Sequence, residues 1–284
     1  MKPQFITCIY SNLEFTRFRG NTDAIYERYK LSLKSLADGG YGIVCYTSAS
    51  HFDELQELYK DNPNLRLIVH ELEDFVHHNK IDQIKTLDSK YLDEAGWRSR
   101  CVEIMWGKFY WLEQHLNEID SDDYLFWIDA GLFHGGLISN THRSETSKNF
   151  FDFDKITQHR NLFNDLSKFT GDKLLNIRTT GVNHGADDFV AVYQVHPEYG
   201  VIGGTFGGKK GVLTQYIDDV QKEMKLFLES NKLVKEEELM YRINWLTPDL
   251  FADYKFSSWY HEDWDFYNEN PEPCFSDFFK VIRE

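Results

Sequence analysis

The chain has 284 residues, of which 42% are hydrophobic and 16% aromatic, so it can bury a sizeable core and is not intrinsically disordered. Its formal net charge of −15 at pH 7 argues against a general role on nucleic acid or on an anionic membrane, because both partners require a basic surface. No run of 18 uncharged apolar residues occurs, and the N-terminus lacks the long apolar stretch of a signal peptide. We therefore expect no transmembrane segment and a cytoplasmic location.

The first seventy or so residues alternate between strand and helix patterns. Short apolar runs at residues 5–10, 43–46 and 65–69 predict strands, and residues 24–36 and 51–59 predict the helices between them. Strands that alternate with helices are typical of a parallel sheet with right-handed crossovers, which is the architecture of a nucleotide-binding half-domain. The first strand ends in polar residues suited to a loop that faces a ligand.

The adjacent pair His77 and His78 could indicate a metal site. However, neighbouring side chains on a helix or a strand point in different directions. We therefore predict a solvated polar turn at this pair rather than a metal site.

Residues 97–116 form a strong helix pattern, with apolar residues at steps of three and four and Lys108 inside the apolar stripe. A lysine on an apolar face either extends its ammonium to the solvent or meets an anion. Because this helix leads into the most apolar strand of the chain, Lys108 could reach a phosphate or a sugar hydroxyl.

That strand lies in residues 124–136, which read YLFWIDAGLFHGG. A continuous apolar run bounded by turn residues is typical of a strand buried on both faces in the centre of a parallel sheet. Asp129 follows the strand directly, and ligands of open α/β sheets bind at the carboxyl ends of the strands. Asp129 is therefore a candidate functional residue, although an aspartate here could also serve only to cap the turn.

The four cysteines, Cys8, Cys45, Cys101 and Cys274, have no CxxC spacing, and three of them lie in apolar segments. We therefore predict buried free thiols of a reducing compartment, and neither a zinc site nor a disulfide framework.

About fifty residues after residue 136 contain one clear helix pattern, at 154–169, with polar links around it, and strand character returns at 189–195. Such a long insertion usually carries specificity. Residues 200–210 are rich in glycine and precede a helix at 212–228, whose N-terminus with Lys209 and Lys210 would favour an anion. A plain glycine-rich turn is the alternative, since no Walker spacing is present.

The acidic residues 236–238 precede an apolar helix at 239–246, where acids in the first turn complement the helix dipole. Residues 254–257 predict a last strand. His261 follows between aromatic and acidic residues, and it could bind a metal, touch a phosphate, or lie on the surface without function.

Taken together, these features resemble a GT-A type glycosyltransferase over most of the chain. The resemblance implies a Rossmann-type α/β fold, with a mixed, mostly parallel sheet flanked by helices in a single large domain. Residues 1–136 would form the half that binds the nucleotide sugar, and residues 137–284, including an aromatic C-terminal tail, the half that binds the acceptor. More narrowly, the opening YSNLEFTRFRG and the WIDAG strand resemble bacterial HtrL/YibB-type proteins, which are associated with surface polysaccharide genes.

In the GT-A family a DxD-like motif binds a divalent metal that holds the diphosphate of the donor. Asp129 matches this motif, but Gly131 stands where a second aspartate is usual, which puts the need for Mn²⁺ or Mg²⁺ in question. The family often supplies a further metal ligand from a C-terminal histidine, so His261 is the candidate here and His134 is the second candidate.

The resemblance also implies contacts to the nucleotide sugar. Residues 201–208, which read VIGGTFGG, are similar to the glycine-rich element that lines the donor sugar and the acceptor in several of these families. The residues expected to bind the donor are Tyr10, Ser11, Arg17, Arg19, Lys108, Gly203 and Gly204.

An inverting transferase also needs a base for the proton of the acceptor hydroxyl. Glu237 and Glu238 match the late acidic pair of the family and are the candidates, whereas a retaining enzyme need not use such a base. Two alternatives remain open: a sugar nucleotidyltransferase, although no basic phosphate loop follows the first strand, and a non-catalytic protein that binds a nucleotide sugar or a glycan.

Overall fold

The computed structural model describes part of the chain, and every structural statement below concerns that part. The described residues are 4–10, 26–27, 29–30, 33–34, 37, 41–88, 101–130, 172–180 and 199–256.

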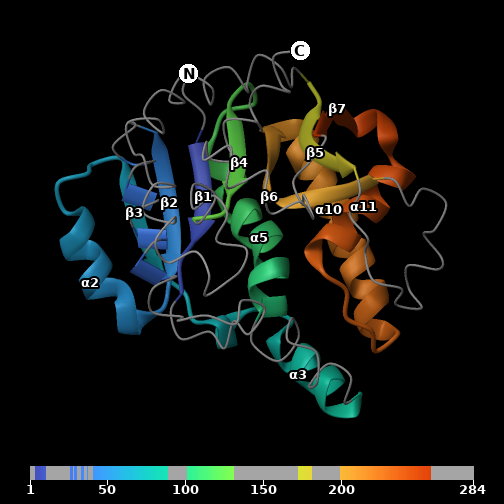
Figure 1. The fold of residues 1–284 in the computed structure, drawn as a ribbon, viewed down its shortest axis with the longest axis horizontal. Helices are drawn as coiled ribbons and strands as arrows, with labels where there is room; N and C mark the ends of the chain where they lie inside the picture. Colours follow the sequence, from blue (N-terminus) through green and yellow to red (C-terminus); the bar gives the residue numbers. More distant parts are fainter. Residues whose placement is uncertain are drawn as a thin grey trace, which may run out of the picture.

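Seven strands form one continuous sheet in the order β3-β2-β1-β4-β6-β5-β7 (Figure 1). Strand β1 is parallel to β2 and β4, β2 is parallel to β3, and β5 is parallel to β7, whereas β6 is antiparallel to both β4 and β5. The predicted fold class, a mixed and mostly parallel sheet flanked by helices, is therefore confirmed. The strands are β1 Gln4–Cys8, β2 Gly42–Thr47, β3 Leu65–Val69, β4 Tyr124–Ile128, β5 Leu174–Thr180, β6 Tyr199–Lys209 and β7 Phe251–Phe256.

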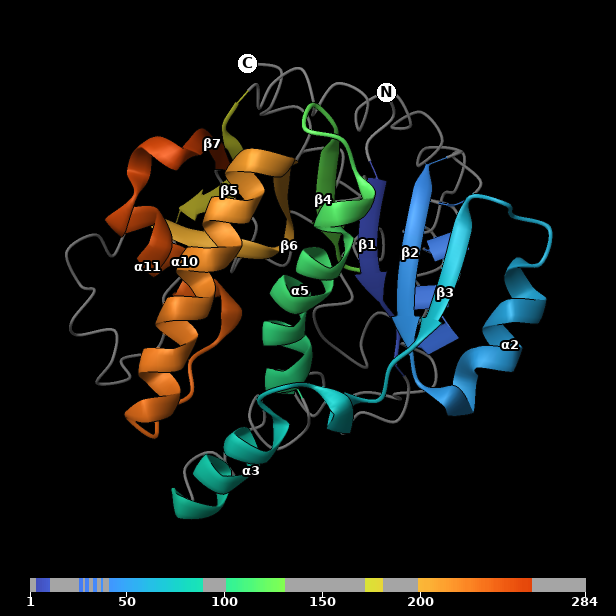
Figure 2. The ribbon, with the colours of Figure 1, turned by 180° about the vertical axis from the view of Figure 1, so that it is seen from behind.

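Helices α5 and α10 lie together in front of the sheet in Figure 2, and α3 extends away from the sheet in both views. None of the helices in the described segments combines the length and the hydrophobicity that a bilayer crossing requires. The α-helices are α2 Ala49–Tyr59, α3 His78–Leu87, α5 Cys101–His115, α10 Lys210–Glu229 and α11 Glu236–Leu246, and the short 3-10 helices are η1 Leu72–Asp74, η2 Leu116–Glu118 and η3 Pro248–Leu250.

The side chains of β4 alternate between two buried faces, as expected of a central strand. Leu125 and Trp127 face α5, and the indole of Trp127 stacks on Trp111 of that helix with 5.9 Å between ring centroids. Phe126 faces the opposite side, where its ring lies 6.0 Å from that of Phe5. Strand β4 is thus fixed by packing on both sides, which makes its carboxyl end a rigid place for a side chain.

Most of the predicted elements are confirmed. The three N-terminal strands are parallel, α2 lies between β2 and β3, and the described residues between positions 26 and 37 are helical. The helix predicted at 97–116 is confirmed from Cys101 to His115, and Leu116 begins η2. Cys8 and Cys45 are free thiols, as predicted, and burial raises the pKa of both.

The alternative of a plain glycine-rich turn at residues 200–210 is wrong, because residues 200–209 lie in the long strand β6. Gly207 has φ +153°, and a Cβ there would lie 2.3 Å from the carbonyl oxygen of Leu125, so close packing against β4 requires glycine. The two lysines also have protein partners: Lys209 pairs with Asp172 at 2.7 Å, and Lys210 donates to the carbonyl of Ile119 at 3.0 Å.

Strand β5 was not predicted, since its sequence LLNIRTT lies within the stretch interpreted as a helix with polar links. The helix predicted at 154–169 and the strand predicted at 189–195 lie outside the described residues. Strand β7 begins at Phe251, three residues before its predicted start.

Candidate functional site

Asp129 directly follows β4, where the parallel strands β1 to β4 end. Its backbone N–H donates to the carbonyl of Gly204 at 2.8 Å, which extends the pairing between β4 and β6 by one residue. The backbone of Asp129 is therefore held by the sheet even though the strand itself ends at Ile128.

The carboxylate of Asp129 is oriented by the strand that precedes it. Residues two apart in a strand point to the same side, and the indole Nε1 of Trp127 donates to Oδ1 of Asp129 at 2.7 Å. The side chain is 42% exposed, and no hydrogen bond from the described residues reaches its second oxygen, Oδ2. One carboxylate oxygen is thus fixed by Trp127, and the other accepts no hydrogen bond within the described part of the chain.

Lys108 of α5 brings a positive charge to the same place. Its Nζ lies 3.0 Å from Oδ1 of Asp129, 3.0 Å from Oε1 of Glu236 and 3.0 Å from the carbonyl oxygen of Gly203. The residue is only 4% exposed, and its ammonium lies 5.5 Å from the ring centroid of Trp127. The lysine on the apolar face therefore does not extend to the solvent; it meets the anionic groups of β4 and α11.

Lys108, Asp129, Glu236 and the carbonyl of Gly203 form what we call the Lys108 cluster. The pKa shifts of its members follow from these contacts. Burial disfavours the charged form of Lys108, but the charges of Asp129 and Glu236 outweigh burial and raise its pKa above the ordinary value. Burial raises the pKa of Asp129, against the opposing effects of Lys108 and the Trp127 hydrogen bond. By formal charge, two carboxylates face one ammonium, and the negative charge in excess favours a cationic ligand.

Glu236 is the first residue of α11, and its side chain is 10% exposed. It packs directly on β6, because a Cβ at Gly203 would lie 2.8 Å from its Cγ. The glycine at position 203 therefore leaves room for Glu236 to reach Lys108. Sequence reasoning missed Glu236, since the acids of this turn were explained by the helix dipole and the contact depends on tertiary packing.

The two predicted bases are placed differently. Oε1 of Glu237 lies 3.5 Å from the backbone nitrogen of Gly203, next to the Lys108 cluster. Oε2 of Glu238 accepts the backbone N–H of Lys235 at 2.9 Å and thus caps its own helix. Of the two, Glu237 is closer in structure to the residues that surround Asp129.

Tyr10 lies two residues after the end of β1 and is 8% exposed. Its hydroxyl donates to the carbonyl of His70 at 2.9 Å, and its ring stacks on Trp111 with 6.1 Å between centroids. A contact between Tyr10 and a nucleotide stays a prediction. The other predicted site residues, Ser11, Arg17, Arg19, Gly131, His134 and His261, lie outside the described part of the chain.

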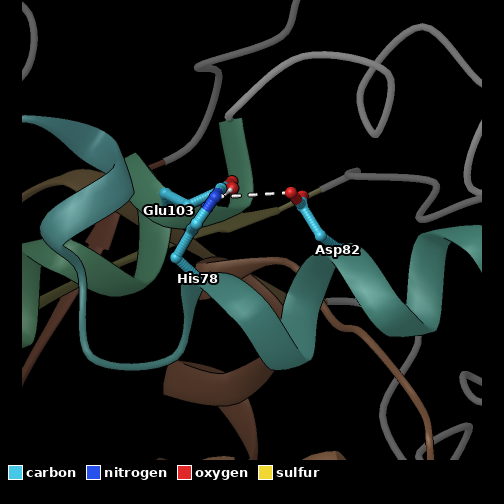
Figure 3. Close-up of side chains that lie close together, drawn as sticks. All are labelled: His78, Asp82 and Glu103. Carbon is cyan, nitrogen blue, oxygen red and sulfur yellow. Dashed lines mark hydrogen bonds and ion pairs between the residues drawn. The ribbon is translucent and has the colours of Figure 1, made fainter.

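A second polar cluster joins α3 to α5 (Figure 3). Nδ1 of His78 lies 3.1 Å from Oε1 of Glu103, and its Nε2 lies 3.3 Å from Oδ2 of Asp82. Lys85 pairs with the other oxygen of Glu103 at 3.4 Å. The solvated turn predicted at His78 is therefore wrong, because this residue begins α3 and its side chain is only 12% exposed.

The ligand atoms of His78, Asp82 and Glu103 all lie within 4.8 Å of one another, a spacing that could hold a metal ion. However, both oxygens of Glu103 already have partners. Oε1 of Glu103 lies beside His78 and Oε2 beside Lys85, so among the described residues each oxygen of this buried acid contacts a nitrogen of a neighbouring side chain. The arrangement is typical of an ion-pair network that fixes one helix against another.

No protein-family model matches the sequence, and no curated protein sequence matches it either. Among solved structures, the chain is similar to mouse xyloside xylosyltransferase 1 in its apo form, with a TM-score of 0.45 and 10% identity over 100% of this chain and 94% of that chain. It is also similar to mannose-1-phosphate geranyltransferase from Thermus thermophilus, with a TM-score of 0.35 and 11% identity over 86% of this chain and 70% of that chain. The scores and the identities are low, so the activity of neither protein is transferred to this chain.

Proposed function

We propose that the chain is a glycosyltransferase that moves a sugar from a nucleoside-diphosphate donor to a hydroxyl group of an acceptor such as a glycan. The observation that carries the proposal is the position of Asp129, a partly exposed acid at the carboxyl end of the central strand β4. The resemblance of the WIDAG segment to the metal-binding motif of GT-A type enzymes supports the same role.

The residues described around Asp129 fit a divalent cation such as Mn²⁺ or Mg²⁺. Hard cations of this kind bind carboxylate oxygens, and Oδ2 of Asp129 accepts no hydrogen bond from the described residues. Asp129 would bind the ion. His261 is the proposed further ligand, and His134 is the alternative. When bound, the cation would stabilise the negative charge that develops on the departing diphosphate.

The protein itself must handle one proton in an inverting reaction. The acceptor oxygen forms a bond to the anomeric carbon while the bond from that carbon to the diphosphate oxygen breaks, and the electron pair leaves with the diphosphate. The proton of the acceptor hydroxyl goes to a carboxylate, for which we propose Glu237, because its side chain lies beside Gly203 next to the Lys108 cluster. Glu238, which caps α11, is the second candidate.

A thermal-shift panel tests the proposal at low cost. Uridine, guanosine, cytidine and thymidine diphosphate sugars are added with and without Mn²⁺, because a ligand that binds only the folded state raises its melting temperature. At a hundredfold excess over Kd the gain is about 2.7 kcal/mol, which is several degrees for a domain of this size. We expect one nucleotide class to give this shift and to be turned over.

The matched variant is Asp129→Asn, which keeps the size of the side chain and its hydrogen bond to Trp127. We expect it to lose turnover by about 10²-fold or more, because charge on the leaving group is no longer stabilised. If a folded Asp129→Asn protein binds and turns over the donor like the wild type, the proposed role of Asp129 is wrong. Release of pyrophosphate from a nucleoside triphosphate and a sugar phosphate would instead identify a nucleotidyltransferase.

A further inference from the structure

The ammonium of Lys108 is surrounded by protein acceptors. A lysine side chain has three N–H donors and no acceptor. Three oxygens, from Asp129, Glu236 and Gly203, each lie 3.0 Å from Nζ. Lys108 can therefore touch a ligand only if it gives up one of these contacts.

The three acceptors come from three different elements of the fold. Asp129 follows β4, Gly203 belongs to β6, and Glu236 begins α11. The contact between Glu236 and the backbone at Gly203 fixes where the carboxylate of Glu236 lies. The position of the ammonium is thus set by Glu236 and Gly203 on one side and by Asp129 on the other.

We propose that Glu236 is a positioning residue for the ligand site at Asp129. By sharing the ammonium of Lys108, it holds that charge on the Oδ1 side of Asp129 and prevents a closed one-to-one pair between the lysine and the aspartate. Oδ2 then keeps the negative charge that a divalent cation requires. The functional consequence rests on the proposed function, whereas the arrangement of the three side chains does not.

The experiment uses the full chain and two readouts that need no sugar donor. The first is the affinity for Mn²⁺ alone, measured by electron paramagnetic resonance. The second is the indole N–H resonance of Trp127, which reports on Oδ1 of Asp129 because Nε1 donates to that oxygen at 2.7 Å. The resonance is assigned with a Trp127→Phe variant.

In Glu236→Gln the second carboxylate no longer attracts the ammonium, so Lys108 pairs more strongly with Asp129. We expect Mn²⁺ to bind about tenfold more weakly, as is common when an outer partner of a metal ligand is lost, and the Trp127 indole resonance to move. Glu236→Asp keeps the charge but withdraws it by one methylene group, and we expect a smaller change in the same direction.

The matched control is Glu103→Gln, which removes a buried acid from the same helix that carries Lys108. It should leave both the Mn²⁺ affinity and the Trp127 resonance as in the wild type. If Glu236→Gln leaves both readouts unchanged, Glu236 is only a structural residue and the inference is wrong. If Mn²⁺ binding is lost in Glu103→Gln instead, the ion binds at His78, and the inference is equally overturned.

The two proposals fail in different ways. If the wild type binds no Mn²⁺, the proposed cation at Asp129 is wrong, and the Trp127 resonance alone decides whether Glu236 positions Lys108. If Mn²⁺ binds and depends on Glu236 but no nucleotide sugar is turned over, the inference holds and the proposed transferase activity fails.

Discussion

Helix α5 carries two buried charges, Glu103 at 0% exposure and Lys108 at 4%, and the protein surrounds them in opposite ways. They lie about 140° apart around the helix axis, so one faces α3 and the other faces the end of β4. Glu103 has His78 at one carboxylate oxygen and Lys85 at the other, and Asp82 contacts the second ring nitrogen of His78. Among the described residues Lys108 has two acids, so by formal charge this part of the site keeps negative charge in excess.

The difference separates two uses of a buried ion pair. A buried acid with a partner at each of its oxygens, such as Glu103, can hold two helices together, but it offers little to a ligand. A cluster with two acids for one ammonium, in which the carboxylate of Asp129 is partly exposed, can bind a cation. The two clusters therefore predict opposite results when their charges are removed one at a time.

The largest effect is expected for Lys108→Met, which removes the ammonium but keeps the length of the side chain. Asp129 and Glu236 would then face each other without a cation, and breaking a buried pair in this way costs several kcal/mol. Because Asp129 is 42% exposed, we expect about 3 kcal/mol at pH 7, near the low end of the range. Urea denaturation measures the difference in the free energy of unfolding between the variant and the wild type. A loss below about 1 kcal/mol would contradict the proposed ion pairs of Lys108 with Asp129 and Glu236.

The cost of Lys108→Met should also depend on pH. Lys108 lowers the pKa of Asp129, so its removal moves that pKa further above the value in the unfolded chain. A carboxyl group with a raised pKa in the folded state contributes stability below its unfolded pKa and loses it as the pH rises through the folded pKa. The stability lost in Lys108→Met should therefore be smallest at acidic pH and should grow toward pH 7. A loss that is the same at every pH would contradict the coupling between Lys108 and Asp129.

Glu103→Gln should destabilise less, by about 2 kcal/mol, because a single buried cation is left without its acid and glutamine still accepts a hydrogen bond. The free energy of unfolding gives the magnitude. Binding of Mn²⁺ and of a nucleotide sugar should be unchanged, since Glu103 faces α3. Loss of ligand binding in a folded Glu103→Gln protein would remove the distinction between the two clusters.

Gly203→Ala perturbs the Lys108 cluster without changing a charged residue. The new Cβ would lie 2.8 Å from Cγ of Glu236 and force that side chain away from Lys108, at a cost of about 1 kcal/mol. The matched control is Gly211→Ala in the first turn of α10, where no atom lies within 4 Å of the added Cβ, so the change should be neutral or slightly stabilising. Equal effects of the two substitutions would mean that Glu236 moves freely.

The smallest effect is expected for Asp82→Asn. The Asp82 side chain is 56% exposed, and exposed ion pairs contribute about 0.5 kcal/mol or less. A loss of more than about 1 kcal/mol in urea denaturation would show that the pair with His78 is more strongly coupled to the buried Glu103 than its exposure indicates.

The N-terminal strands and α5 could be predicted because their patterns are local. Strand β4 is apolar on both faces, and the stripe of α5 repeats at helical steps. By contrast, Gly207 of β6 is required by its contact with β4, and Gly203 by its contact with Glu236, both of which lie far away in the chain. A glycine-rich strand therefore has the local signature of a turn, and the sequence pattern did not indicate a strand there.

The candidate site shows the same limit. Asp129 could be found because it follows the most apolar strand directly, and Lys108 because it breaks an apolar stripe. Glu236 stands in a run of three acids, and nothing in the run distinguishes the acid that reaches Lys108 from those that contact Gly203 or Lys235. The ion pair to Lys108 spans 128 positions of the sequence, which no local pattern records.

The antiparallel position of β6 has a consequence for the division of the chain at residue 136. On its two sides β4 pairs with β1 and with β6, and β6 follows some seventy residues later. A fragment that ended at residue 136 would leave β4, the most apolar strand, with a row of unpaired backbone groups at the edge of its sheet, which is a template for aggregation. We therefore expect the N-terminal part to be insoluble when it is expressed alone.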